Sequence, residues 1–220
     1  MKERGMIFNA EMVRAILDGR KTQTRRPIKW KQTRFTEIGE REDGSKWLWS
    51  EDAEHACDFW HPCPFGAVGD RIWVREAYRF PASLDDVSPT GVGEMAVATG
   101  YRKPWAPTFY EFTGTFSDGW KGFETPPKVS DAGKLRPSIH MPRWASRILL
   151  EITDVRVERL KSISDGDAIR EGCSTADMKS GDCVADVFAR LWASIYGAES
   201  WNANPWVWVI EFKRVEGGAA

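Results

Sequence analysis

The stretch "NAEMVRAILDGRKTQTRRPI", residues 9–28, joins a helical pattern to a strand-like one. Apolar residues recur at helical spacing between positions 12 and 17. Asn9 lies just before them, and its side chain can cap the free backbone N–H groups at the start of a helix. Gly19 is a natural helix stop, because glycine adopts the left-handed conformation at little cost. The sequence therefore predicts a helix, a corner at Gly19 and a strand over 22–28.

Positive charge is concentrated at this corner, although the formal net charge of the whole chain is only −1. A solvated basic face, a phosphate-binding patch and a site that deprotonates one lysine would each explain it. Arginines keep their protons, so crowding by them disfavours the ammonium form of a neighbouring lysine. A neutral amine on Lys21 could then take the hydroxyl proton of Thr24. The cations concerned are Arg20, Lys21, Arg25, Arg26 and Lys29.

Composition limits the classes of function. A net charge of −1 argues against a protein that coats nucleic acid, so any such contact is expected to be local. No apolar run is long enough to span a bilayer, and no apolar segment follows the N-terminal charges as it would in a signal peptide. We therefore expect a cytoplasmic protein without a membrane partner, whose four cysteines stay reduced.

The remaining patterns predict strands with helices between them. "RILLEITDVRVERL" (147–160) is the strongest strand signal, and a strand over 204–216 closes the chain. A short helix is expected from Ser164, with a capping-box partner at Asp167, and a longer one over 184–197. Because no strand–helix–strand rhythm appears, we predict an α+β domain around a mixed or closed sheet. The segments 30–66 and 80–137 are predicted to be largely loop, with a short hairpin within 108–116.

Several of these stretches together resemble the ASCH domain family. They are "ILDGRKTQTRR", the Gly-Asp turn before "RIWVREAY", "AIREG" and the terminal "WVIEFK". The resemblance implies a PUA-like mixed β-barrel with peripheral helices. It also implies a single domain over 1–220, with long insertions at about 30–60 and 80–137. The family signature falls on Gly19, Lys21 and Arg26, and the larger size is similar to that of phage- and prophage-encoded members.

Many members carry a glutamate at the position of Thr24. The threonine resembles the bacterial subgroup that hydrolyses N4-acetylcytidine, and that resemblance implies Lys21 as base, Thr24 as nucleophile and Glu171 as acid. It implies no cofactor or metal, a modified cytidine nucleoside or RNA as partner, and the cytosol of a bacterium or a phage-infected host as location. The expected substrate-binding residues are Arg26, Arg20, Arg75 and Glu76.

The roles that the resemblance implies for Glu171, Lys21 and Thr24 can be considered from their positions in the predicted helix and strand. A carboxylate in the last turn of a helix faces the negative end of the dipole, which raises its pKa and suits Glu171 to proton donation. In a regular strand Lys21 and Thr24 would point to opposite faces, so they converge only if Lys21 lies in the turn. Glu76 adjoins Arg75 in a strand, so one of the two charges faces inward and must be paired. Three other carboxylates could supply the acid instead: Asp165, Asp167 and Glu76.

Other classes of function stay open at this point. The alternative is an RNA-binding or ribonucleolytic ASCH domain in which the same cations hold phosphates. A third possibility is an accessory protein that binds a host partner. A zinc site is disfavoured, because the available His and Cys residues do not have a usual structural-zinc spacing. These residues are His55, Cys57, His61 and Cys63.

Overall fold

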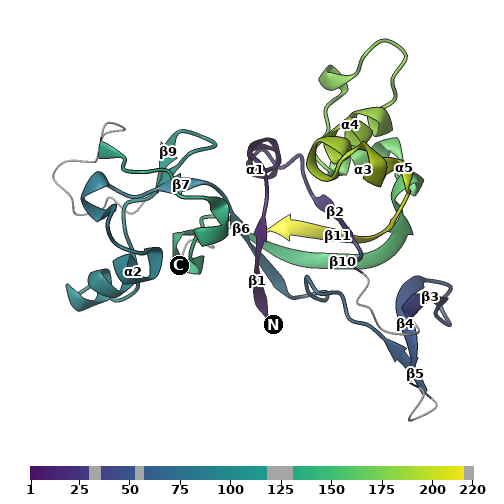
Figure 1. Cartoon of the computed structure of the whole chain (residues 1–220), viewed down its shortest axis with the longest axis horizontal. Coiled ribbons are helices and arrows are strands. Elements are labelled where there is room, and N and C mark those ends of the chain that lie inside the picture. The colour runs from purple at the N-terminus through teal and green to yellow at the C-terminus, as the bar shows by residue number, and fades with distance from the viewer. Residues whose placement is uncertain (30–35, 53–56, 118–130, 216–220) are drawn as a thin grey trace. The chain divides into compact units, whose positions relative to one another are not determined.

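The computed structural model describes residues 1–29, 36–52, 57–117 and 131–215. These residues form an α+β structure with one five-stranded sheet and two three-stranded sheets (Figure 1), which confirms the predicted class. The chain forms two compact units, each built from several segments. The first contains Ala15–Arg71 and Glu151–Lys213, and the second contains Glu3–Arg14 and Ile72–Leu150. The expected single domain stays a prediction.

The five-stranded sheet has the order β1-β6-β10-β11-β2, so β1 and β2 are its edges. The described strands therefore form an open sheet rather than a closed barrel. Three of the strands, β2, β10 and β11, lie within one or two residues of the predicted segments 22–28, 147–160 and 204–216. Their alternating patterns are long or lie beside clear turns. The bounds are β1 Glu3–Ile7, β2 Gln23–Pro27, β6 Arg71–Arg75, β10 Leu149–Arg159 and β11 Trp206–Arg214.

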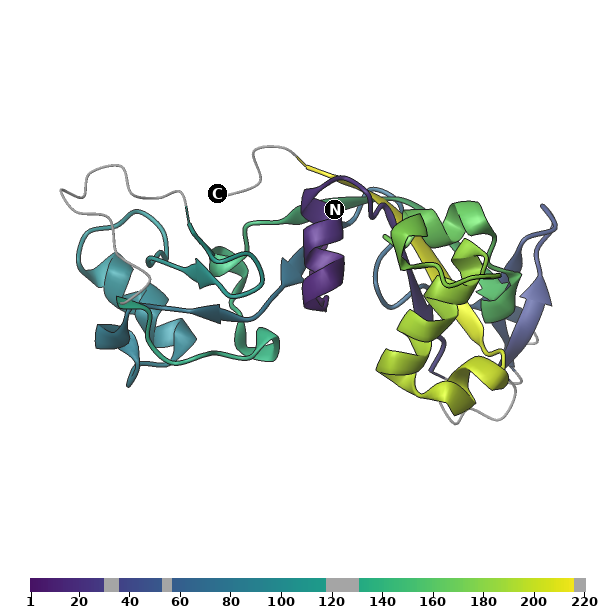
Figure 2. The ribbon, with the colours of Figure 1, turned by 90° about the horizontal axis from the view of Figure 1, so that it is seen from above.

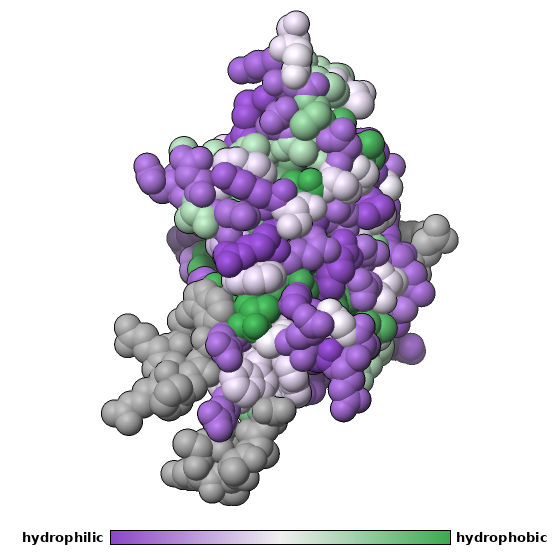
Figure 3. Space-filling model, turned by 90° about the vertical axis from the view of Figure 1, so that its right-hand side faces the viewer, coloured by the Kyte–Doolittle hydropathy of each residue, from purple (hydrophilic) through white to green (hydrophobic). Residues whose placement is uncertain are grey.

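In the first unit, helices cover one side of β2 and β11, as Figures 1 and 2 show. β2 pairs antiparallel with β11, with Gln23 opposite Glu211 and Arg25 opposite Val209. Val207 and Val209 are buried against these helices in an apolar cluster with Phe188 and Trp192. Hydrophilic residues cover most of the face in Figure 3, because the apolar side of each element is turned inward. The helices are α3 Asp165–Arg170, α4 Val184–Tyr196 and α5 Ala198–Asn202.

A three-stranded sheet in the first unit corrects the prediction of loop for this part of the chain. It consists of β3 (Thr36–Glu40), β4 (Lys46–Asp52) and β5 (Cys57–Trp60). Trp49 lies opposite Trp60, and cross-strand aromatic pairs of this kind stabilise a sheet. The segment contains many charged residues, and this composition is typical of loop and turn.

The second unit contains the predicted hairpin and an additional helix. β8 (Phe109–Tyr110) pairs with β9 (Thr115–Phe116) and with β7 (Tyr78–Arg79). Helix α2 (Pro89–Ala98) was not predicted, because its proline and glycines suggest a loop. Ser88 caps it by accepting from the Gly91 N–H, and a proline fits the first helical position.

A further helix lies near the N-terminus, and several 3-10 turns connect other elements. Helix α1 (Ala10–Leu17) begins after Asn9, which accepts from the Met12 N–H at 2.9 Å as the capping prediction required. Among the described residues no helix is long and apolar enough to cross a bilayer. Short 3-10 turns lie at Ala82–Leu84, Ser138–His140, Arg143–Ala145, Leu160–Ser162 and Thr175–Asp177.

Candidate active site around a buried lysine and glutamate

Lys21 lies in the corner between α1 and β2, as the sequence predicted. Gly19 has a φ of 74°, and the N–H groups of Arg20 and Lys21 both donate to the Ala15 carbonyl, at 2.9 and 3.0 Å. β2 begins only at Gln23. This tight turn lets the Lys21 side chain enter the protein, where none of it is exposed to solvent.

Glu171 reaches Lys21 from the end of α3. The helix starts with the predicted capping box, in which Ser164 Oγ accepts from the Asp167 N–H at 3.1 Å. Glu171 follows its last residue, and Gly172 then has a φ of 96°. A Cβ at Gly172 would lie 3.0 Å from the Ala15 Cβ and 3.2 Å from the Lys21 Cβ. Glycine therefore allows the end of α3 to pack directly against the corner.

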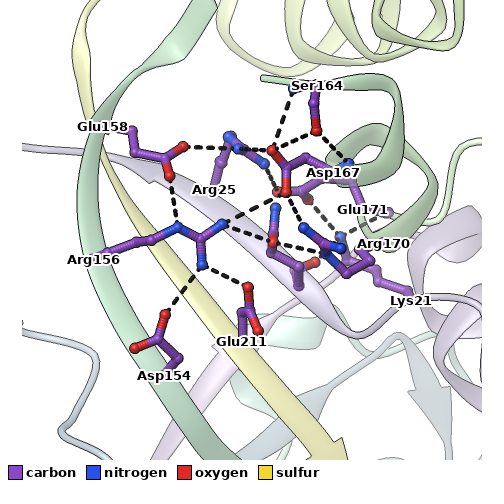
Figure 4. A network of polar contacts seen from close by, with 11 residues as sticks. Lys21, Arg25, Asp154, Arg156, Glu158, Ser164, Asp167, Arg170, Glu171 and Glu211 are labelled. Carbon is purple, nitrogen blue, oxygen red and sulfur yellow. Dashed lines mark hydrogen bonds and ion pairs between the residues drawn. The ribbon is translucent and has the colours of Figure 1, made fainter. Parts of the chain in front are cut away.

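The Lys21 ammonium group has one acceptor for each of its three N–H groups. Nζ donates to Glu171 Oε2 at 2.8 Å, to the Glu171 carbonyl at 2.7 Å and to the Gln23 carbonyl at 2.7 Å (Figure 4). The Glu171 side chain is 1% exposed. Of the three acceptors only the carboxylate is basic enough to take a proton from Nζ. A neutral amine at Lys21 therefore arises most directly by transfer to Glu171.

Burial lowers the pKa of Lys21 below its usual 10.5, because the charged form is removed from water. The carboxylate of Glu171 opposes this shift, and the positive charge of Arg26 adds to it. A lowered pKa of Lys21 is the direction expected from the sequence. The main cause differs, because burial lowers this pKa more than the neighbouring Arg26 does, whereas the sequence pointed to crowding by arginines.

Arg25 is the second cation at Glu171. Its side chain is fully buried, and Nη1 lies 3.3 Å from Glu171 Oε1. Nη2 lies 3.1 Å from Glu158 Oε2 and 3.3 Å from Asp167 Oδ2. Both oxygens of Glu171 are thus bound, one to Lys21 and one to Arg25. A solvated basic face does not describe these two cations.

Asp167 is held as a carboxylate. Burial would raise its pKa, but hydrogen bonds from Ser164, the charge of Arg25 and a hydrogen bond from Arg170 lower it to about 2. A group with this pKa donates no proton near neutral pH. Asp165 is occupied in accepting from the Ala185 N–H at 3.0 Å. Asp165 and Asp167 lie in the first turn of α3, whereas Glu171 follows its last turn and bonds to Lys21.

Arg156 extends the network along β10. It donates to Glu158 Oε1 and Glu211 Oε1, both at 2.6 Å, and to Asp154 Oδ2 at 3.2 Å. Figure 4 shows the three carboxylates around the Arg156 guanidinium, which in turn lies beside Asp167. The carboxylates in this network are therefore positioned by arginines.

Thr24 lies on the other face of β2. Residues directly opposite each other in an antiparallel pair share a face, and successive residues alternate. Gln23 and Arg25 are therefore on the side of α3, whereas Thr24, opposite Ile210, is on the far side. Thr24 is buried, with 1% of its surface exposed. The structure brings Lys21 to Glu171, while Thr24 lies on the face of β2 away from α3, and its role as nucleophile stays a prediction.

Gln23 is a residue of this site that the sequence interpretation passed over. Its Oε1 accepts from Arg156 at 3.2 Å and from Arg170 at 3.4 Å. Its Nε2 is buried and has no hydrogen-bond partner among the described residues, and the same holds for Nε of Arg25. The strand period of two within β2 places Gln23 and Arg25 on one face, so alternation along the expected strand would have paired these two residues.

Arg20 and Arg26 are two of the predicted substrate-binding residues. Arg20 is 48% exposed at its side chain, pairs with Asp18 at 3.1 Å and donates to the Gly172 carbonyl at 3.0 Å. Arg26 is half-buried and contacts the Tyr196 hydroxyl at 3.5 Å. Their assignment to substrate binding stays a prediction.

Arg75 and Glu76 belong to the second unit. Glu76 is the inward charge and is paired as expected, with both carboxylate oxygens 2.9 Å from Arg147 nitrogens. Burial raises the pKa of Glu76, while Arg147 opposes the shift. Arg75 stacks on Trp73 at 4.5 Å from the ring centroid. Whether either binds substrate stays a prediction.

The four residues considered as zinc ligands, His55, Cys57, His61 and Cys63, are only partly described by the structure. His55 and the side chain of Cys57 lie outside the described residues. His61 shares a hydrogen bond with Ser50 Oγ at 2.8 Å, and Cys63 is buried. In the parts of the chain that the structure describes, no cluster of His, Cys, Asp and Glu is arranged to hold a metal ion.

Comparison of the chain with family models, with curated proteins and with solved structures gives no match in any of the three.

Proposed function

We propose that this protein is an ASCH-type amidohydrolase of PUA-like ancestry that acts on an N4-acylated cytosine base or nucleoside. The observation that carries the proposal is the contact between Lys21 Nζ and Glu171 Oε2 at 2.8 Å, with the side chains 0% and 1% exposed. Replacing a buried ion pair by apolar residues is often neutral or stabilising. A pair of this kind is thus a poor device for stability alone, and acid–base chemistry gives it a purpose.

The reaction adds water across the amide C–N bond. A hydroxyl oxygen bonds to the acyl carbon, the C–N bond breaks, and the leaving nitrogen takes a proton, so N4-acetylcytidine yields cytidine and acetic acid, which releases its proton to solvent as acetate. Transfer of one proton from Nζ to Oε2 turns the ion pair into an amine and a carboxylic acid. Lys21 then takes the proton of the attacking hydroxyl, and Glu171 gives its proton to the leaving nitrogen. This restores the ion pair.

We assign the attack to water. Strand alternation places Thr24 on the face of β2 opposite to Gln23 and Arg25, whereas a water molecule needs no side chain on a particular face. The prediction that Thr24 attacks has a direct test, because Thr24→Ser keeps a hydroxyl and Thr24→Val removes it. Attack by water predicts that Thr24→Val retains turnover, provided that the variant folds. Attack by Thr24 predicts that only the serine variant does.

The defining experiment measures release of cytidine from N4-acetylcytidine by the purified protein without added metal. A chelator should leave the rate unchanged. Lys21→Arg keeps a positive charge but cannot act as a base, so turnover should fall by about 10²–10⁴-fold. Absence of turnover across a panel of N4-acylcytosine compounds would refute the proposed function.

A further inference from the structure

Two buried donors at the candidate site lack acceptors among the described residues. They are Nε2 of Gln23 and Nε of Arg25, and neither side chain is exposed to solvent. A buried donor without a partner is costly, because its hydrogen bond to water is lost and nothing replaces it. Most buried polar groups in proteins are therefore satisfied by protein, water or ligand. Each of these two N–H groups is thus suited to an oxygen acceptor.

Neighbouring charges hold both donors in place. Arg156 and Arg170 donate to the Gln23 amide through its Oε1, so a flipped amide would turn its NH₂ group toward two cations. Arg25 is held through its two terminal nitrogens by carboxylates, and Nε is the guanidinium nitrogen without an acceptor among the described residues. A donor whose orientation is fixed in advance needs no reorganisation during a reaction.

The two donors belong to the Lys21 site by register and by contact. Gln23 and Arg25 lie on the same face of β2, two residues apart. The Gln23 carbonyl accepts from Lys21 Nζ at 2.7 Å, and Arg25 contacts Glu171 at 3.3 Å. The unpartnered N–H groups are therefore on the residues that flank the proposed acid–base couple.

We propose that Gln23 Nε2 and Arg25 Nε hold the carbonyl oxygen of the scissile amide. This inference rests on the proposed amidohydrolase function and assigns two further catalytic residues to it. When hydroxyl oxygen adds to the acyl carbon, the carbonyl π electrons move to the oxygen, which becomes negative. Two N–H donors, one of them on a guanidinium, stabilise that charge until the C–N bond breaks. No additional proton or co-reactant is required.

The matched variant is Gln23→Glu. It keeps the shape and the oxygen that Arg156 and Arg170 contact, but it replaces the NH₂ donor by a second acceptor. We expect kcat to fall by about 10²–10³-fold, the effect of losing one such donor, with KM less affected. Thermal stability should be unchanged or higher, because two arginines then face a carboxylate. Wild-type kcat in this variant would overturn the inference.

The pH profile separates a lost donor from a changed Lys21. An added carboxylate would also raise the pKa of Lys21, and a loss from that cause would shrink as the pH rises. The proposal requires a loss of equal size across the profile. A second variant, Gln23→Met, removes donor and acceptor without adding charge. It should show the same loss of kcat, together with lower stability, and normal turnover in it would count against the proposal.

A measurement independent of turnover uses the side-chain amide signals of the two glutamines, Gln23 and Gln32. Titration with acetate at constant ionic strength should shift the ¹⁵N-labelled Gln23 amide saturably, and the Gln23→Glu spectrum identifies that signal. A Gln23 signal that does not respond to acetate overturns the inference even if the protein hydrolyses the substrate. A saturable shift without hydrolysis rejects the proposed function and retains the acceptor site.

Discussion

Lys21→Met tests whether the buried lysine is bound as tightly as its contacts imply. The variant keeps most of the side-chain volume but leaves three buried acceptors, two carbonyls and the Glu171 carboxylate, without their donor. Removing one partner of a buried ion pair costs about 3–5 kcal/mol. For a chain of 220 residues this corresponds to a fall in Tm of about 6–20 °C. Urea denaturation at pH 7 measures the free energy of unfolding directly.

Two further variants complete this test. Lys21→Met combined with Glu171→Leu removes both charges, and we expect it to recover most of the lost stability, since apolar replacement of a buried pair is often neutral. Arg20→Met breaks an exposed pair with Asp18 and an exposed hydrogen bond to the Gly172 carbonyl, which together should cost about 1–2 kcal/mol. A Lys21→Met variant that loses less than the Arg20→Met control would refute the description of Lys21 as a buried, fully paired ammonium.

The remaining predictions concern protonation and partners. The Asp167 pKa of about 2, below 3.8, means that its carboxylate stabilises the fold above about pH 4 and that this contribution is lost as the pH falls toward 2. Asp167→Asn should therefore flatten the acid limb of the stability profile, and an unchanged limb would contradict the assignment. The ¹³Cε signal of Lys21 should titrate below 10.5. The free energy of unfolding should then rise with pH between that lowered pKa and 10.5. In this range the lysine binds a proton in the unfolded chain but not in the folded protein. RNA should bind weakly with a shallow dependence on salt, whereas tight binding with a steep slope and no hydrolysis would favour the RNA-binding alternative.

Local features of this chain were predictable from its sequence because neighbouring residues decide them. Gly19 ends the first helix through its own backbone freedom, so the corner that contains Lys21 follows from one residue. Ser164 and Asp167 cap α3 across three positions. β10 and β11 follow from the alternation of apolar residues. The three-stranded sheet β3–β5 was missed, because its many charged residues are typical of a loop, whereas the pairing that sets Trp49 opposite Trp60 is formed between strands.

The arrangement of the candidate site depends on contacts between distant parts of the chain. Spacing within β2 indicates that Gln23 and Arg25 share a side, but it does not indicate what lies on that side. Packing of α3 against the corner, which Gly172 permits, places Glu171 beside Lys21 across 150 positions. Burial, which lowers the pKa of Lys21, is likewise a property of packing. Sequence by itself determined which residues carry the charge, and only the tertiary structure decided which charges meet, because ion pairing and desolvation depend on distance in space.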